Sequence, residues 1–257
     1  MTDRLRRAGC VYADEEARIL LDRASDPGEL ELLLQRRVAG VPLEHVVGWA
    51  GFDRGRVLVA PSVFVPRRRT ELLVDLACEH LPTSAVVVDL CCGSGAIAAA
   101  IAARRPDAEI HATDLDPDAV ACARRNLSGP GCHVWQGDLF DGLPSSLLGR
   151  VSVVVANAPY VPTNGLGLMP GEARRYEKPL SLDGGPDGLD PHRRIIGDLR
   201  RWLAPRGTFI VEVGRHQTAP LQGLLRRRGF RAHLAEDEHR DATALVAHPR
   251  RAANRCR

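Results

Sequence analysis

The sequence lacks any run of about 18 consecutive apolar residues, the length that a membrane-spanning helix requires. Its first ten residues, Met1 to Cys10, carry charges but no apolar core of the kind that a secretory signal peptide contains. We therefore expect no membrane segment, and a reducing cytoplasm is the compartment consistent with these features.

The sequence also lacks a C-x-x-C pair. Its seven cysteines are an odd number and lie scattered at positions 10, 78, 91, 92, 122, 132 and 256. This distribution argues against a disulfide framework and against a zinc site, so we expect no bound metal. We interpret the adjacent Cys91 and Cys92 as two small buried side chains rather than a redox switch.

A strong excess of charge of one sign is missing as well. The formal net charge is +3, but the tail at 249–257 contains four arginines and no acidic residue. Removing these four from the 35 basic residues leaves 31 against 32 acidic ones. Residues 1–248 therefore lack the net positive charge that is typical of a nucleic-acid-binding domain. We expect the Arg-rich tail to be disordered.

The chain is long enough, at 257 residues, for one substantial core and a small second unit. Residues 1–45 are predicted to form a helical N-terminal region, since two apolar clusters within 13–38 flank the turn Asp26-Pro27-Gly28. Residues 46–64 combine β-branched and aromatic residues with glycines, which is typical of a β-hairpin. We interpret this hairpin as a linker to the next domain.

Residues 65–248 begin with a helical period at 71–80 and then alternate short apolar runs with helical ones. This alternation is typical of an α/β domain with a parallel sheet wrapped by helices. The predicted strands lie near 85–89, 109–114, 132–136, 151–156, 207–213, 231–235 and 243–247. The predicted helices lie near 95–104, 117–127, 190–203 and 217–228.

The stretch from Val161 to Asp190 interrupts this alternation. It is rich in Gly and Pro and has little periodicity. A loop this long inside a compact domain is usually a binding loop or a lid. Glu172, Arg175 and Glu177 are candidate substrate contacts there, although a solvated charge cluster is the more frequent role of such residues.

The segment from Val86 to Ala96 contains a strand, a turn with two glycines and a helix start. Gly93 and Gly95 let the backbone approach a ligand, and the following helix offers unpaired N–H groups to an anion. The spacing differs from the dinucleotide motif G-x-G-x-x-G, because Ala98 stands at the third glycine position.

Four successive predicted strands end in a polar residue: Asp89, Asp114, Asp138 and Asn157. A single Asp in such a place is more often a helix cap or a turn former. The series favours a nucleoside-binding edge of the sheet, in which Asp114 accepts the ribose hydroxyls and Asp138 meets an adenine amino group. Open α/β sheets bind their ligands at this edge.

The corner from Asn157 to Tyr160 closes the fourth strand abruptly. It presents the side-chain carbonyl of Asn157, the main-chain carbonyl of Ala158 ahead of Pro159, and the ring of Tyr160. Such a corner can hold a planar amide or amino group by its N–H bonds while the tyrosine stacks against it. Alone, Asn-x-Pro is more often a simple turn.

Together these motifs resemble the class I S-adenosylmethionine-dependent methyltransferases. More narrowly, the segment from Phe64 to Glu71 is similar to the Pro-Arg…Thr-Glu segment of the protein-(glutamine-N5) methyltransferases, whose best-known members modify peptide chain release factors. The same resemblance recurs in 171–180 and 187–190 and covers about residues 40–248.

The resemblance implies a Rossmann-like seven-stranded α/β domain, a small helical N-terminal domain that helps recognise the protein substrate, and a β-hairpin linker. It implies that S-adenosylmethionine is the cofactor and that a protein with an exposed glutamine, such as a release factor, is the partner. The amide would be gripped at Asn157, Ala158, Pro159 and Tyr160. The residues implied for the cofactor are Phe64, Arg67, Asp89, Cys91, Gly93, Ser94, Gly95, Asp114, Leu115, Asp138, Leu139 and Asn157.

Two departures from the family pattern stand out. The family usually has Asn-Pro-Pro-Tyr, whereas Ala158 replaces the first proline here. The carbonyl is retained, but the corner loses ring stiffness that is typically worth roughly 0.4 to 1 kcal/mol. The N-terminal helical region is also shorter than in the release-factor enzymes, which leaves the identity of the substrate open.

Three other functions remain alternatives: an adenine-N6 or other amino-group methyltransferase, a cofactor-binding protein without catalysis, and a nicotinamide-dependent dehydrogenase. The near-neutral body weighs against nucleic acid, and a dehydrogenase leaves the Asn157 corner unexplained. We expect a monomer. The histidines at 45, 111, 133 and 239 are expected to be surface or strand-end residues without a function.

Overall fold

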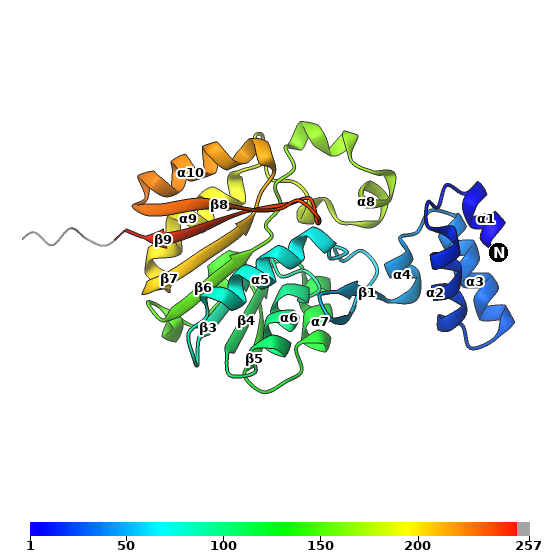
Figure 1. Cartoon of the computed structure of the whole chain (residues 1–257), viewed down its shortest axis with the longest axis horizontal. Helices are drawn as coiled ribbons and strands as arrows, with labels where there is room; N and C mark the ends of the chain where they lie inside the picture. The colour runs from blue at the N-terminus through cyan, green and yellow to red at the C-terminus, as the bar shows by residue number, and fades with distance from the viewer. Residues whose placement is uncertain (251–257) are drawn as a thin grey trace, which may run out of the picture.

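The N-terminal part of the computed structural model, which describes residues 1–250, consists of four helices (Figure 1). They are α1 (Thr2–Arg7), α2 (Ala13–Arg23), α3 (Pro27–Val38) and α4 (Leu43–Val47). Only α2 and α3 were expected, because α1 and α4 are too short to show a helical period. Asp26 caps α3 by accepting from the N–H groups of Gly28 and Glu29.

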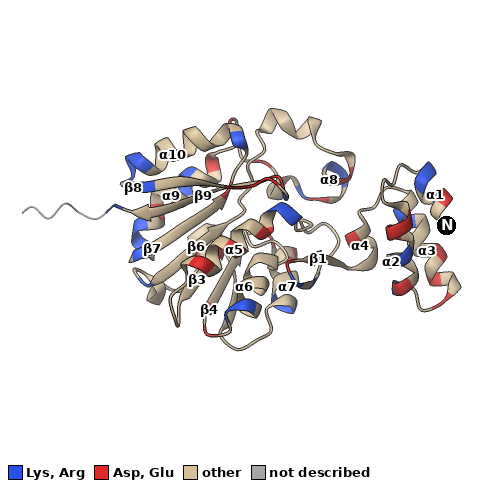
Figure 2. Cartoon of the chain, in the orientation of Figure 1, with Lys and Arg blue, Asp and Glu red and all other residues tan. Residues whose placement is uncertain are grey.

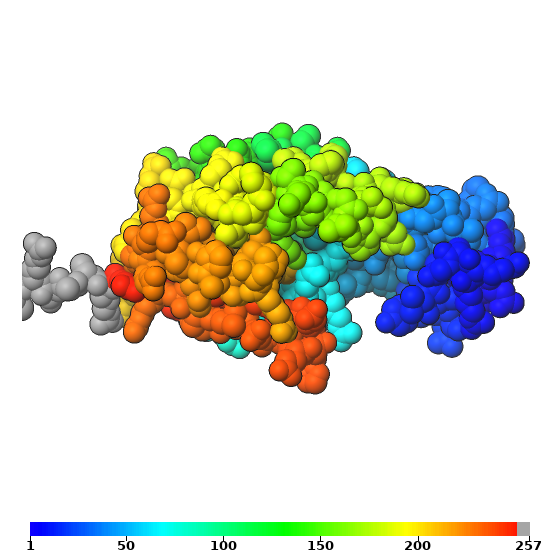
Figure 3. Space-filling model, turned by 90° about the horizontal axis from the view of Figure 1, so that it is seen from above, coloured from blue at the N-terminus to red at the C-terminus, as the bar shows by residue number. Residues whose placement is uncertain are grey.

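These four helices enclose a small core of their own, formed by Leu5, Leu20, Leu33, Leu34 and Val46 with their neighbours. Acidic and basic residues are interspersed along α1, α2 and α3 (Figure 2), in keeping with the balanced charge of the body of the chain. The helices project from one end of the molecule (Figure 3). The link to the rest is the antiparallel hairpin of β1 (Trp49–Phe52) and β2 (Gly55–Leu58).

The larger part of the chain forms a seven-stranded sheet in the order β5-β4-β3-β6-β7-β9-β8. Its strands are β3 (Val86–Leu90), β4 (Glu109–Asp114), β5 (Cys132–Gln136), β6 (Val151–Ala156), β7 (Leu203–Glu212), β8 (Phe230–Asp237) and β9 (Ala242–Pro249). The strands from β5 to β7 are parallel, whereas β9 runs antiparallel to both β7 and β8. The strand order reverses between β3 and β6, which is where open α/β sheets bind their ligands.

Helices cover both faces of the sheet, as the buried apolar runs of a parallel sheet require. The apolar side chains of α5 (Glu71–His80), α6 (Ala96–Arg104) and α7 (Pro117–Asn126) pack with one face. Those of α9 (Asp190–Trp202) and α10 (Thr218–Arg227) pack with the other. Val87, Val88, Val153 and Val154 in the central strands are fully buried, so this α/β fold class is the one the sequence predicted.

Two segments differ from the sequence expectation. The stretch 161–190, expected to be irregular, contains α8 (Gly171–Tyr176) and 3-10 turns at Thr163–Leu168 and Pro179–Ser181. Positions 249 and 250 do not belong to the expected disordered tail, because Pro249 lies in β9 opposite Phe230 and the N–H of Arg250 donates to the carbonyl of Gly229. Proline is tolerated there because it stands at the end of the strand. The rest of the predicted tail, 251–257, lies outside the described residues.

Among residues 1–250, no helix has both the length and the apolar character needed to cross a membrane. The six cysteines in this part of the chain are free thiols. Cys92 is buried, as expected for one of the adjacent pair, while Cys91 is only partly buried.

Candidate active site

A cleft opens at the carboxyl ends of the central strands. Almost all residues that the sequence predicted for the site line it: Phe64, Arg67, Cys91, Gly93, Ser94, Asp114, Leu115, Asp138, Leu139, Asn157, Ala158, Pro159 and Tyr160. The fold brings them together from segments nearly a hundred residues apart. Asp89 and Gly95 belong to the same turn but do not line the cleft.

The turn after β3 and the end of β4 are joined through Asp114. Its carboxylate accepts from the N–H of Gly93 at 2.8 Å and from the N–H of Asp116 at 2.9 Å. Burial raises the pKa of Asp114, and these backbone hydrogen bonds oppose that rise. An ionised carboxylate has about four acceptor positions, so two remain for a ligand.

Asp89 lies behind the cleft at the end of β3 and is fully buried. One of its oxygens accepts from the N–H of Ala98 at 3.2 Å, whereas the other has no partner among the described residues. Burial raises the pKa of Asp89 to about 8. Gly95 lies at the start of α6, where a Cβ atom would come within 3.0 Å of the Cβ of Ala123 on α7.

Asp138 and Leu139 follow β5 and border the cleft on another side. Asp138 accepts from Arg194 of α9 at 2.8 Å. Leu139 has a φ of 55°, and its carbonyl accepts from the Thr113 hydroxyl at 2.7 Å. This hydrogen bond holds a backbone conformation that costs a leucine roughly 1 to 2 kcal/mol.

The corner after β6 is held by a hydrogen-bond network. Asn157 Nδ2 donates to Thr70 Oγ1 at 3.2 Å, and the Tyr160 hydroxyl donates to Glu212 Oε1 at 3.2 Å and accepts from Arg69 at 2.7 Å. Burial, followed by the charge of Glu212, raises the pKa of Tyr160 to about 12. Tyr160 is therefore a neutral hydrogen-bonding group at physiological pH. Ala158 is buried in the core against the sheet.

Thr70, Arg69 and Glu212 were not predicted as site residues, although Thr70 and Arg69 belong to the segment that carries the family resemblance. Glu212 ends β7, and the same rule that picked out the polar residues ending the four earlier strands applies to it. Extending that rule to the fifth strand would have found it.

The segment 161–190 is anchored over the cleft by three ionic contacts. Glu177 is buried and accepts from Arg67 at 2.5 Å and from the N–H of Val65 at 3.3 Å. Lys178, the only lysine in the sequence, donates to Asp116 and Asp118 at the start of α7.

Among the candidate substrate contacts of this segment, Arg175 alone forms no ion pair with another residue of 1–250. Glu172 accepts from Arg37 of α3 at 2.6 Å, and Glu177 is engaged with Arg67. The expectation of a solvated charge cluster is thus wrong for Glu177. Its buried carboxylate accepts hydrogen bonds from the N–H of Val65 and from the side chain of Arg67. Arg175 is exposed.

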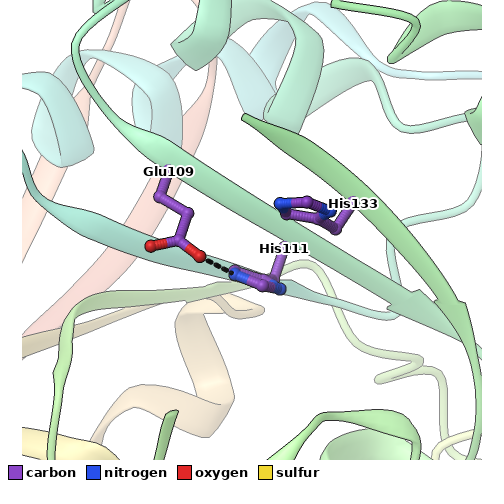
Figure 4. A group of neighbouring side chains, drawn as sticks. All are labelled: Glu109, His111 and His133. Carbon is purple, nitrogen blue, oxygen red and sulfur yellow. Dashed lines mark hydrogen bonds and ion pairs between the residues drawn. The ribbon is translucent and has the colours of Figure 1, made fainter. Parts of the chain in front are cut away.

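A second cluster of titratable side chains lies on the sheet away from the cleft (Figure 4). Glu109, His111 and His133 bring three possible metal-ligand atoms within 4.8 Å of one another. However, the indole N–H of Trp135 donates to His111 Nδ1 at 3.1 Å, which places the imidazole proton on Nε2, facing Glu109 at 3.0 Å. A metal at Nε2 would move that proton to Nδ1, against the indole donor, so this arrangement does not favour a metal site.

His111 itself differs from the expectation of a surface residue, since only 3% of it is exposed. Its ring stacks on His133 with the centroids 4.8 Å apart. His45 is buried too and contacts the carbonyl of Val63 at 2.9 Å. His111 uses both ring nitrogens, and His45 uses Nε2, in hydrogen bonds within the fold.

The sheet order, the acidic strand ends and the amide corner define the class I methyltransferases. Residues 55–167 match the family model of the methyltransferase small domain. A methyltransferase from Pyrococcus furiosus has the same fold at 15% identity, with a TM-score of 0.56 over 75% of this chain and 87% of its own.

Within that class, the chain belongs to the release factor glutamine methyltransferase family. It is 37% identical over 214 residues to the release factor glutamine methyltransferase of Geobacter sulfurreducens, and the match covers 81% of this chain and 74% of that one. It is also 36% identical to the 4-amino-L-phenylalanine/4-methylamino-L-phenylalanine methyltransferase of Streptomyces pristinaespiralis, over 79% of this chain and 71% of that one. The predicted family resemblance is confirmed, and the chain is a methyltransferase.

Proposed function

We propose that the protein transfers a methyl group from S-adenosylmethionine to the side-chain amide nitrogen of a glutamine in a protein, with a peptide chain release factor as the substrate. The observation that supports the proposal is that Asn157 and Ala158, whose side-chain and main-chain oxygens are hydrogen-bond acceptors, line the same cleft as Asp114 and Asp138. The similarity to release factor glutamine methyltransferases supports it.

The chemistry of the cleft fits the cofactor. The two unused acceptor positions of Asp114 suit the ribose hydroxyls, and Asp138 suits the adenine amino group. Leu115 and Leu139 line the cleft and suit the faces of the base, while Phe64 and Arg67 help to enclose the ligand from the other side. When bound, S-adenosylmethionine supplies a methyl group attached to a positively charged sulfur.

The acceptor part of the site suits a planar amide. Asn157 Oδ1 and the main-chain carbonyl of Ala158 would accept the two N–H bonds of the glutamine, and the Tyr160 ring would stack against it. An amide is a weak nucleophile. The rate therefore depends on positioning its nitrogen about 3 to 3.5 Å from the methyl carbon and on acceptors that stabilise the positive charge developing on the nitrogen. The nitrogen gains the methyl group, sulfur keeps the electron pair of the broken bond, and the nitrogen then releases one proton.

Recognition of the protein substrate is assigned, as part of this proposal, to the helical region of residues 1–45. The hydrogen bond between Arg37 and Glu172 supports this assignment, because it joins α3 to the segment 161–190, which borders the cleft. The monomeric state and the cytoplasmic location stay predictions from the sequence.

The proposal is tested by incubating the protein with a release factor and S-adenosylmethionine carrying an isotopically labelled methyl group, followed by peptide mass spectrometry. We expect one labelled methyl on a single glutamine. Asn157→Ala should lower kcat on the order of 100-fold with little change in cofactor Kd. Asp114→Ala should mainly weaken cofactor binding. Unchanged turnover in Asn157→Ala would contradict the role given to this corner.

Methylation of an amino group on a small molecule is a second candidate. The Streptomyces pristinaespiralis relative, whose name specifies 4-amino-L-phenylalanine, favours it. An aromatic amine also presents N–H bonds to the carbonyl acceptors of the corner. The same labelled cofactor should be offered with 4-amino-L-phenylalanine, and methylation of this acceptor without methylation of a release factor would replace the first proposal by the second.

A further inference from the structure

Glu212 ends β7 directly beside the acceptor corner. Ala156 of β6 pairs with Val211 of β7 in the parallel register, so the next residues along, Asn157 and Glu212, lie side by side. Glu212 is only 3% exposed, and both of its carboxylate oxygens are used within the protein. Oε2 accepts from the Thr70 hydroxyl at 2.6 Å, while Oε1 accepts from Arg69 at 3.0 Å and from Tyr160.

These contacts determine which side chain donates and which accepts in the hydrogen bond between Thr70 and Asn157. A threonine hydroxyl has a single proton, and at Thr70 this proton points to the carboxylate of Glu212. Thr70 Oγ1 can therefore only accept from Asn157, which places Nδ2 of the amide toward Thr70 at 3.2 Å. The other end of the amide, Oδ1, is left for the cleft that Asn157 lines.

We propose that Glu212 and Thr70 are positioning residues of the transfer reaction, which hold the Asn157 amide with its oxygen toward the acceptor. This inference rests on the proposed function. If the amide were turned over, its NH2 group would face the N–H bonds of the substrate, and two donors would meet where a donor and an acceptor are required. Through Tyr160, the same carboxylate also holds the ring at the mouth of the corner.

The test compares two substitutions of Thr70. Valine keeps the shape of threonine without the hydroxyl, whereas serine keeps the hydroxyl without the methyl group. If Thr70 positions Asn157, Thr70→Val should lower kcat at least tenfold, Thr70→Ser should stay within about threefold of wild type, and cofactor Kd should change less than twofold in both. A packing role alone predicts the opposite order, with valine active and serine impaired, and that order would overturn the proposal.

Glu212→Gln supplies the second arm. Its side chain no longer determines which way the Thr70 hydroxyl points, so kcat should fall tenfold or more with KM for the acceptor nearly unchanged. Wild-type kcat in this variant would overturn the role of Glu212. Circular dichroism and cofactor binding show for each variant that the fold is intact.

A measurement without turnover separates this inference from the proposed function. In an isotope-labelled sample, the Nδ2 hydrogens of Asn157 should exchange with solvent at similar rates in wild type and Thr70→Ser, and at least fivefold faster in Thr70→Val. Equal rates in all three proteins would refute the orientation, whatever acceptor the enzyme uses. A wild-type protein that methylates no release factor would refute the proposed substrate while leaving this result standing.

Discussion

Asp89 illustrates, at the scale of a residue, how burial alone changes the chemistry of a carboxylate. It is fully buried at the end of β3, and one of its oxygens has no hydrogen-bond partner among residues 1–250. Burial raises the pKa of Asp89 to about 8, far above the value of about 3.9 in an unfolded chain. We therefore expect Asp89 to be protonated in the folded protein at neutral pH.

The pH dependence of stability should reveal this proton. Between pH 4 and 8 the folded state holds a proton that the unfolded chain releases, so the contribution of Asp89 to the free energy of unfolding falls as pH rises, by about 1.4 kcal/mol per pH unit. Asparagine mimics the protonated form and can still accept from Ala98. Asp89→Asn should thus gain stability over wild type as pH rises from 5.5 to 7.5, measured by urea unfolding. A difference that is independent of pH would show that Asp89 is ionised.

The two glycines of the turn after β3 act at the scale of elements, and they do so differently. Gly93 has a φ of 55° and open space around a Cβ atom, whereas Gly95 has a φ of 77° and would press a Cβ atom against Ala123 of α7. Gly93 is therefore required by the left-handed turn and not by packing against a neighbouring helix. Gly95 also lets α6 pack closely on α7.

Alanine substitutions separate these two roles. Gly93→Ala should lower the free energy of unfolding by about 1 to 2 kcal/mol, the cost of a left-handed alanine. Gly95→Ala adds an overpacking cost of roughly 1 to 3 kcal/mol, so it should be clearly more destabilising. Denaturant unfolding of both variants at one pH provides the comparison. Equal losses would mean that α6 and α7 can separate without cost.

Arg37 connects three parts of the whole molecule. It lies on α3, where it donates to the buried Glu16 of α2 at 2.6 Å and to Glu172 of α8 at 2.6 Å. The side chains of Arg37 and Glu16 are each about one-tenth exposed, while that of Glu172 is half exposed. Figure 3 shows the segment of α8 reaching toward the N-terminal helices.

Removing Arg37 and removing the charge of Glu172 should have unequal effects on the free energy of unfolding. Arg37→Ala leaves Glu16 buried without its partner and should destabilise the protein by about 3 kcal/mol or more. Glu172→Gln removes only an exposed charge and should cost less than about 1 kcal/mol. The free energies of unfolding of the two variants check this. A similar loss of unfolding free energy in both variants would mean that the contact of Arg37 with Glu172, and not that with Glu16, provides the stabilisation.

Much of the fold could be predicted from local patterns. The seven strands, the helices between them and the hairpin follow from apolar periodicity and from Gly and Pro, which depend on near neighbours in the chain. Short elements such as α1 and α4 could not be predicted in this way, because fewer than two helical turns show no period. Helix α8 was missed for the same reason.

The sequence by itself determined that Asp114, Asp138 and Asn157 gather at the cleft, since residues that end successive parallel strands must lie at one edge of the sheet. Only the tertiary structure decided what each of them does there. It turned Asp89 and Gly95 away from the cleft, tied Glu177 to Arg67, and brought Glu212 and Thr70 to the Asn157 amide. Such pairings join residues about 90 to 140 positions apart, and strand register and side-chain packing, which no local pattern encodes, decide which atoms meet.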